Sequence, residues 1–246
     1  MRQCPQCKVA VLDDEANFCI ECGSKLETEN QKSEVQSSIS DKTSSQQNLS
    51  EKMTDVIKSA PINLDKKSEI INVIKGQKIK LNCQPKIEVI LSWICDKNFD
   101  IDAAAFLLDS SGKVSSDENF IFYNNRKHSS GCAEHITVNN TCEKIKLNLE
   151  NIPEDISKIA FTLTINDSEK NNQNFGLIQS INLKINDSTS SCLVYDLNNN
   201  LTVETAIVVA EIYRYKNEWK FNAIGAGFSG GLVALCKNFG VDVDTK

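Results

Sequence analysis

Four cysteines near the start of the chain have a spacing suited to binding a metal ion. Cys4 and Cys7 form one CxxC pair, Cys19 and Cys22 form a second, and 11 residues separate the two pairs. Zinc favours four thiolate ligands in a tetrahedron, and each CxxC turn lets two sulfurs converge on one ion without strain. Four such ligands fill every position, so a structural site is predicted, because a catalytic zinc ion needs a position open to water. A redox or disulfide pair is the alternative use of these thiols.

A segment as short as residues 1–26 cannot bury enough apolar surface to fold by itself. The metal must therefore supply the missing stability, which is on the order of 10 kcal/mol in zinc-finger peptides. We predict that the four cysteines hold one structural Zn²⁺ in a small zinc ribbon over residues 1–26.

Two carboxylates further along the chain could bind a different cation. Asp100 and Asp102 are two residues apart, so on a strand both side chains project from one face. The apolar run 103–108 follows directly, which places the pair where a strand meets a loop. Calcium is a hard cation that takes about 6–8 oxygen ligands, and loop carboxylates at strand ends commonly supply them. A solvated acidic strand entry without metal is the alternative.

The elements that position these groups are predicted to be strands. Short β-branched and aromatic runs, separated by Asn, Asp, Ser and Gly, continue from Pro61 almost to the end of the chain, and this spacing is typical of an all-β sandwich. The runs cover residues 70–74, 79–81, 87–93, 103–108, 119–123, 145–149, 159–165, 177–185, 193–195, 203–215 and 219–224.

One short helix is predicted near the C-terminus, because apolar residues recur at helical spacing over 232–239. Ser229 is its expected N-cap and Gly240 its stop signal. The sandwich domain is predicted to span residues 61–246. A disordered linker is predicted over residues 27–60, which are rich in Ser, Gln, Lys and Glu and contain no aromatic residue and no glycine.

Composition limits the function classes. The 246 residues are 40% hydrophobic, and 33 acidic side chains outnumber 27 basic ones, so a general electrostatic footprint for nucleic acid is absent. No apolar run approaches the ~18 residues of a spanning helix, and the N-terminus lacks a signal-peptide core. The expectation is a cytoplasmic protein without a transmembrane segment.

The remaining polar groups form no catalytic constellation. His128 and His135 lack a CxH or HxxxH partner and are interpreted as polar loop histidines. The glycine-rich segment 225–231 is interpreted as a packing turn, with an anion-binding nest as the alternative. The six other cysteines are interpreted as buried or idle thiols: Cys83, Cys95, Cys132, Cys142, Cys192 and Cys236. We therefore expect no enzymatic activity.

The second domain resembles a known family. The matching segments occur in the order of the family, at residues 99–109, 112–114, 116–124, 173–176, 204–206, 211–214, 218–221 and 225–232. They are similar to segments of the TerD family of tellurium-resistance and general stress proteins, which are calcium-binding β-sandwiches. The CxxC pairs lie outside that domain and look like the zinc ribbons that bacteria append to diverse stress and membrane-associated proteins.

The resemblance bears directly on calcium. In the family, a His is followed by an acidic, glycine-rich loop that provides much of the coordination. After His135, Asn139 and Thr141 match that pattern, but Val138 stands where the acid belongs, and the later acidic cluster is missing because 144–147 already reads as a strand. Fewer carboxylates lower both ligand number and site charge, so we expect weak or lost Ca²⁺ binding. The candidates that the resemblance leaves are Asp100, Asp102, Asp117, Asn139, Glu143 and Asp167.

Together these features favour a non-enzymatic, metal-binding stress-response adaptor of the tellurium-resistance type. Its expected partners are proteins, such as other stress-response or membrane-associated components. The alternative is a nucleic-acid-binding regulator. In it the zinc ribbon would recognise the nucleic acid, and the TerD-like domain, with a degenerate calcium site, would serve as a scaffold. Acidic residues near the two CxxC pairs outnumber the basic ones, which are Arg2, Lys8 and Lys25. This argues against a phosphate-binding surface.

Overall fold

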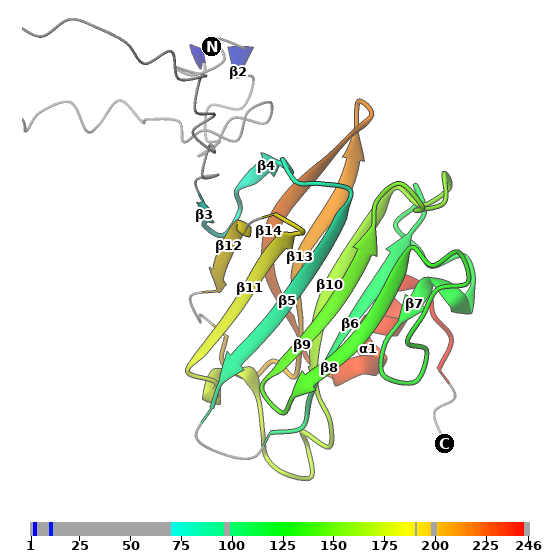
Figure 1. The fold of residues 1–246 in the computed structure, drawn as a ribbon. Helices are drawn as coiled ribbons and strands as arrows, with labels where there is room; N and C mark the ends of the chain where they lie inside the picture. Colours follow the sequence, from blue (N-terminus) through cyan, green and yellow to red (C-terminus); the bar gives the residue numbers. More distant parts are fainter. Residues whose placement is uncertain are drawn as a thin grey trace, which may run out of the picture. The chain divides into compact units, whose positions relative to one another are not determined.

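The structure is a computed structural model that describes residues 2–3, 10–11, 70–95, 99–189, 191–197 and 201–243. From residue 70 onward, two six-stranded sheets face each other (Figure 1). The first sheet has the spatial order β4 (Lys78–Lys80), β14 (Glu218–Phe228), β13 (Ala206–Tyr215), β10 (Lys158–Ile165), β6 (Ile101–Leu108) and β7 (Phe120–Ile121). The second has the order β3 (Ile71–Val73), β12 (Ser191–Leu197), β11 (Ser180–Asp187), β5 (Lys86–Ile94), β9 (Cys142–Asn148) and β8 (Ala133–Asn139).

Neighbouring strands of both sheets run antiparallel, except that β12 pairs with β3 in parallel. Two 3₁₀ turns, η2 (Asp117–Asn119) and η3 (Phe175–Leu177), precede β7 and β11. The all-β sandwich that the sequence predicts is therefore confirmed.

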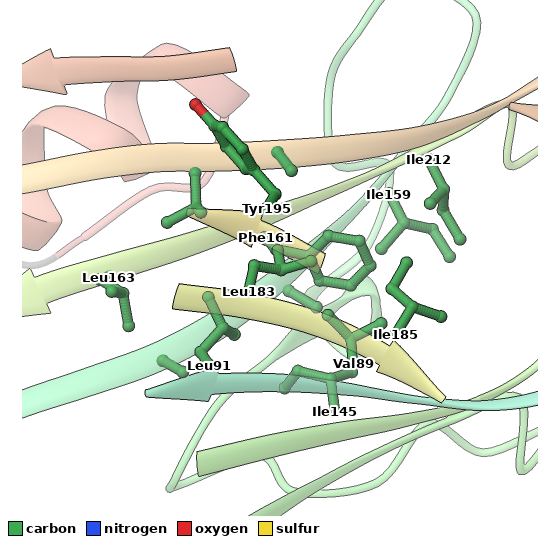
Figure 2. Close-up of a cluster of buried hydrophobic side chains, with 14 of the residues drawn as sticks. Val89, Leu91, Ile145, Ile159, Phe161, Leu163, Leu183, Ile185, Tyr195 and Ile212 are labelled. Atoms are coloured by element: carbon green, nitrogen blue, oxygen red, sulfur yellow. The ribbon is translucent and has the colours of Figure 1, made fainter. Parts of the chain in front are cut away.

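The core lies between the sheets and is built from the inward-facing residues of both. Figure 2 shows Phe161 of β10 among Val89, Leu183 and Ile185 of the opposite sheet. Alternate residues of β5 are buried and half-exposed, as a strand with one solvated face requires. Tyr195 of β12 is also fully enclosed in this core.

The continuous apolar run of β6 has a structural reason. Ala103, Ala105 and Leu107 face the inter-sheet core, whereas the alternate side chains, including Phe106, belong to a second apolar cluster on the outer face of the first sheet. The helix α1 (Gly231–Phe239) contributes its buried residues to that second cluster. Because both faces of β6 are covered, the strand shows no alternation.

The ends of α1 correct one detail of the prediction. Gly240 ends the helix in a left-handed conformation with φ 77°, as expected. The N-cap residue is Gly230, and Ser229 makes no cap. Instead the amides of Gly230 and Gly231 donate to the hydroxyl of Thr205, from the segment before β13, at 3.2 and 2.9 Å. A tertiary contact has replaced the local cap.

The segment around His135 is the largest departure from the predicted strands. It was expected to be a loop, but it forms β8, which pairs antiparallel with β9. His135 is consequently 2% exposed, and His128 is 3% exposed with hydrogen bonds to Ser130 and Asn119. The loop interpretation is therefore wrong for His135, which lies on β8, whereas His128 does lie in the loop before β8, and both rings are buried.

The interpretation of the six scattered cysteines is also corrected for two of them. Cys83 and Cys192, 109 residues apart in the chain, form a disulfide with a Cα–Cα separation of 6.1 Å. Both lie beside the end of β11, which is the strand between β5 and β12. Spacing in the sequence carries no signal of this contact, because it depends on strand order. Cys132, Cys142 and Cys236 keep free thiols.

At the N-terminus the structure describes the antiparallel pair β1 (Arg2–Gln3) and β2 (Ala10–Val11). In sequence, this pair brackets Cys4 and Cys7. All four zinc-spaced cysteines and the predicted linker, residues 27–60, lie outside the described residues, so the zinc ribbon and the linker stay predictions. No helix in the described part of the chain is both long and apolar enough to cross a bilayer.

Candidate metal centre

An acidic cleft of about 550 Å³ opens at the end of the sandwich where β6 begins and β5 and β8 end. Its lining includes Asp100, Asp102, Asn139 and Glu143, which are four of the six predicted calcium residues. The strand order explains this convergence, because β8 and β9 of the second sheet face β6 of the first at this end. Residues that are about 40 positions apart in the chain thus share one cleft.

Glu143 is the buried centre of the cleft, although it carries a charge. It projects inward from β9, and its Oε2 accepts hydrogen bonds from the Ala103 amide of the opposite sheet at 2.6 Å and from His135 Nε2 at 3.0 Å. Its Oε1 accepts from the Thr137 hydroxyl at 3.0 Å. Burial alone would raise the pKa of Glu143, but the bonds from His135, Ala103 and Thr137 outweigh it and hold that pKa below its ordinary value.

The position of Ala103 explains why a carboxylate is needed there. The short β7 pairs only with Ala105 and Phe106 of β6. The Ala103 amide lies beyond that pairing and donates to Glu143 instead. A buried amide without an acceptor is costly, so Glu143 completes the hydrogen bonding of β6 and joins the two sheets.

Asp100 and Asp102 form the solvent-facing part of the cleft. The Asn166 side-chain amide donates to Oδ2 of Asp102 at 2.6 Å and to Oδ2 of Asp100 at 3.3 Å. Burial, and next the charge of Glu143, raise the pKa of Asp102, and the hydrogen bond from Asn166 only partly offsets them. The negative charges of Asp100, Asp102 and Glu143 therefore lie close together and are only partly offset by neighbouring groups of the protein.

Two predicted residues do not join this cleft. Asp117 lies in η2, beyond the Leu108 end of β6, and does not line it. Asp167 has a left-handed backbone, φ 47°, and its exposed side chain pairs with Lys170 at 3.5 Å. Its neighbour Asn166 is the residue that reaches the aspartates. The sequence did not predict that Asn166, Thr137 and His135 belong to the site. An acidic pattern indicates the carboxylates, but it carries no information about the side chains that hydrogen-bond to them.

The donor chemistry fits a hard cation such as Ca²⁺, since carboxylate and amide oxygens surround the cleft. The geometry is more restrictive. One carboxylate oxygen from each of Asp100, Asp102 and Glu143 cannot be chosen so that all three oxygens lie within 4.8 Å of one another. Glu143 also already accepts three hydrogen bonds. A calcium ion with ligands at about 2.4 Å needs its donors closer together than that. Asp100 and Asp102 are thus the two carboxylates most free to bind a cation.

The fold and this cleft define a class: a two-sheet β-sandwich with an acidic site at one end. The TerD domain profile matches residues 70–239, and the chain belongs to the TerD family. It is 50% identical over 138 residues to "Chemical-damaging agent resistance protein B" of Clostridium acetobutylicum, which covers 53% of this chain and 99% of that protein. It is 40% identical over 154 residues to "Tellurium resistance protein TerD" of Serratia marcescens, covering 59% of this chain and 80% of the relative.

A solved structure supports the fold. The crystal structure of SAV2460, a protein of unknown function, superposes with a TM-score of 0.52 over 65% of this chain and 98% of that one, at 16% sequence identity. At that identity the likeness concerns the fold alone.

Proposed function

We propose that this chain is a stress-response protein of the tellurium-resistance type that acts as a metal-binding adaptor and not as an enzyme. The observation that carries the proposal is a TerD domain with an acidic cleft that is lined by carboxylates and amides. Next to the cleft, the buried His135 hydrogen-bonds to Glu143 and, among the described residues, forms no bond to a serine or cysteine that it could activate as a nucleophile. The printed names of the two relatives, both resistance proteins, support the link to chemical stress.

Two metals are part of the proposal. The spacing of Cys4, Cys7, Cys19 and Cys22 supports a structural Zn²⁺. The first pair lies in sequence between the paired strands β1 and β2, as in a zinc knuckle built on a hairpin. The acidic cleft supports weak Ca²⁺ binding through Asp100 and Asp102 on the surface above Glu143. Bound calcium would neutralise the uncompensated charge there.

Calcium binding can be tested with two aspartates that differ in position. Calorimetric titration of the full zinc-loaded chain with CaCl₂ is expected to give weak binding to wild type and at least tenfold weaker binding to Asp102→Asn. Asp117→Asn, the control, is expected to bind as wild type does, because Asp117 lies outside the cleft. Without calcium, Asp102→Asn should be no less stable than wild type, since the raised pKa of Asp102 means its charge opposes folding. Equal losses in both variants, or no heat in wild type, would contradict the calcium part.

The adaptor function predicts that partner capture depends on the zinc site. Tagged full-length protein from cells treated with tellurite is expected to recover defined proteins, and Cys4→Ser with Cys7→Ser is expected to lose that recovery by at least tenfold along with the bound zinc. Cys142→Ser is the matched control, because this free half-buried thiol lies on β9. The measurement is quantitative mass spectrometry of the eluate together with zinc analysis. Recovery that is unchanged in the zinc-free variant would refute the adaptor function.

A further inference from the structure

Cys83 and Cys192 lie with Asp187 in a three-residue cluster at the end of the sandwich opposite the acidic cleft. Cys83 lies in the connection between β4 and β5, Asp187 is the last residue of β11, and Cys192 is the second residue of β12. One ligand atom from each lies within 4.8 Å of the other two. Three separate segments of chain therefore meet here.

Asp187 holds this junction together through both of its oxygens. Its Oδ2 accepts from the Gln84 amide at 3.0 Å, and its Oδ1 accepts from the amide and hydroxyl of Thr189 at 2.8 and 2.7 Å. The same Oδ2 lies 3.5 Å from the sulfur of Cys192. The carboxylate is thus placed to accept a proton from the Cys192 thiol when the two sulfurs are reduced.

The two cysteines differ in access. Cys83 is half-buried at the margin of the core and its neighbours in the chain are exposed, whereas Cys192 is 9% exposed. Two of the free cysteines, Cys132 and Cys236, are fully buried, and burial raises the pKa of Cys236 to about 11. A small oxidant in solution therefore reaches Cys83 more readily than these buried thiols, because oxidation follows exposure and thiolate character.

We propose that Cys83 and Cys192 form a reversible oxidation site, in which a hydroperoxide oxidises Cys83 and Cys192 closes a disulfide with the help of Asp187. The Cys83 thiol first loses its proton to solvent. The thiolate attacks the terminal oxygen of the hydroperoxide, the O–O bond breaks, and the alkoxide or hydroxide takes up a proton from solvent and leaves as alcohol or water, with a sulfenic acid remaining on Cys83. The Cys192 sulfur then attacks the sulfenic sulfur as Asp187 takes its proton. The hydroxyl takes that proton from Asp187 and leaves as water, so two thiols and one hydroperoxide give one disulfide, one alcohol (water, when the oxidant is hydrogen peroxide) and one further water.

The disulfide would change stability more than shape. The Cα–Cα separation of 6.1 Å lies within the range that a disulfide spans, so closing the bond needs little backbone movement. The bond joins residues 109 positions apart in the chain, and such a long loop loses much entropy in the unfolded state when it is cross-linked. It also fastens β12 beside the register shift in its pairing with β11, between Ile185 and Asn186.

The test uses the full-length protein, reduced and then treated with hydrogen peroxide. Remaining thiols are alkylated and the peptides are mapped by mass spectrometry. The expected product is a cross-linked peptide pair that contains Cys83 and Cys192 and lacks two hydrogen atoms, and excess reduced glutathione is expected to restore both thiols. The oxidised form is expected to melt on the order of 10 °C above the reduced form. Cys142→Ser, the control, should behave as wild type does.

Three variants separate the steps. Cys192→Ser is expected to stop at a sulfenic acid on Cys83 that dimedone traps, and Cys83→Ser is expected to give neither adduct nor cross-link. Asp187→Asn should form the cross-link at least tenfold more slowly while the sulfenic acid accumulates, because the proton acceptor is gone.

Three results would each overturn the proposal. The pair could stay reduced in peroxide, or the disulfide could resist excess glutathione and so be a permanent bond. The reduced pair could instead retain a zinc ion that Cys83→Ser loses, which would make the cluster a metal site. None of these outcomes depends on the calcium or partner measurements.

Discussion

Replacing Phe161 by alanine is expected to lower the free energy of unfolding by about 4 kcal/mol. Phe161 is fully buried on β10 and packs in the middle of the inter-sheet core shown in Figure 2. Removing its ring deletes apolar burial and leaves a cavity, and the close-packed strands around it can collapse only in part. Urea unfolding followed by circular dichroism, with wild type and variant compared at the same calcium and redox state, measures the difference.

Val203→Ala is the control for this measurement, because the Val203 side chain is 66% exposed. Its expected effect is within about 0.5 kcal/mol. If Phe161→Ala also cost less than about 1 kcal/mol, Phe161 could not lie in a tightly packed core, and the described facing of the two sheets would be wrong.

Replacing Glu143 by alanine is expected to lower the free energy of unfolding by about 3 kcal/mol in the presence of a calcium chelator. The variant leaves the Ala103 amide and the His135 Nε2 inside the sandwich without their acceptor. Each unpaired buried donor costs about 1–3 kcal/mol, so the two together give this magnitude. Glu150→Ala is the control, since Glu150 lies exposed on the turn that follows β9, and its effect is expected to be within about 0.5 kcal/mol.

The same variant carries a pH signature. The pKa of Glu143 is lowered in the folded protein relative to its ordinary value of 4.5, so the stabilisation is present above pH 4.5 and is lost as pH falls through the folded pKa. The difference in unfolding free energy between wild type and Glu143→Ala should therefore be constant near pH 7 and shrink below pH 4.5. A difference that grows on acidification would mean that Glu143 is not held ionised by its three donors.

Glu143 has two conceivable roles, as a calcium ligand and as a hydrogen-bond acceptor for the protein. The sequence places Glu143 among calcium ligands, whereas in the described structure its oxygens serve the protein itself. The structural role and the metal role are therefore separable by measurement. Glu143→Ala should unfold more easily whether or not calcium binds, whereas Asp102→Asn should weaken calcium binding without lowering the stability of the calcium-free protein.

Patterns within short stretches of the sequence were sufficient to predict the sandwich. The alternation of buried and half-exposed residues on β5 and the continuous apolar run on β6 depend only on whether one or both faces of the strand are buried. Burial of a face is visible in the hydrophobicity of consecutive residues. The helix over Gly231–Phe239 and its end at Gly240 are local in the same way. The closeness of Asp100 and Asp102 was also predictable, because residues two positions apart in an extended segment project to the same side, and in the structure one Asn166 amide contacts both.

Contacts between distant segments followed only from the arrangement of the strands. β8 was missed because only Ala133 and His135 of its residues are buried, and its pairing with β9 decides that it is a strand at all. The donors to Glu143 come from the facing sheet and the neighbouring strand. Cys83 meets Cys192 because β11 separates β5 from β12 by one strand. Hydrophobic periodicity records whether a residue is buried, but it does not record which strand lies beside it, and that pairing decides the cleft and the disulfide.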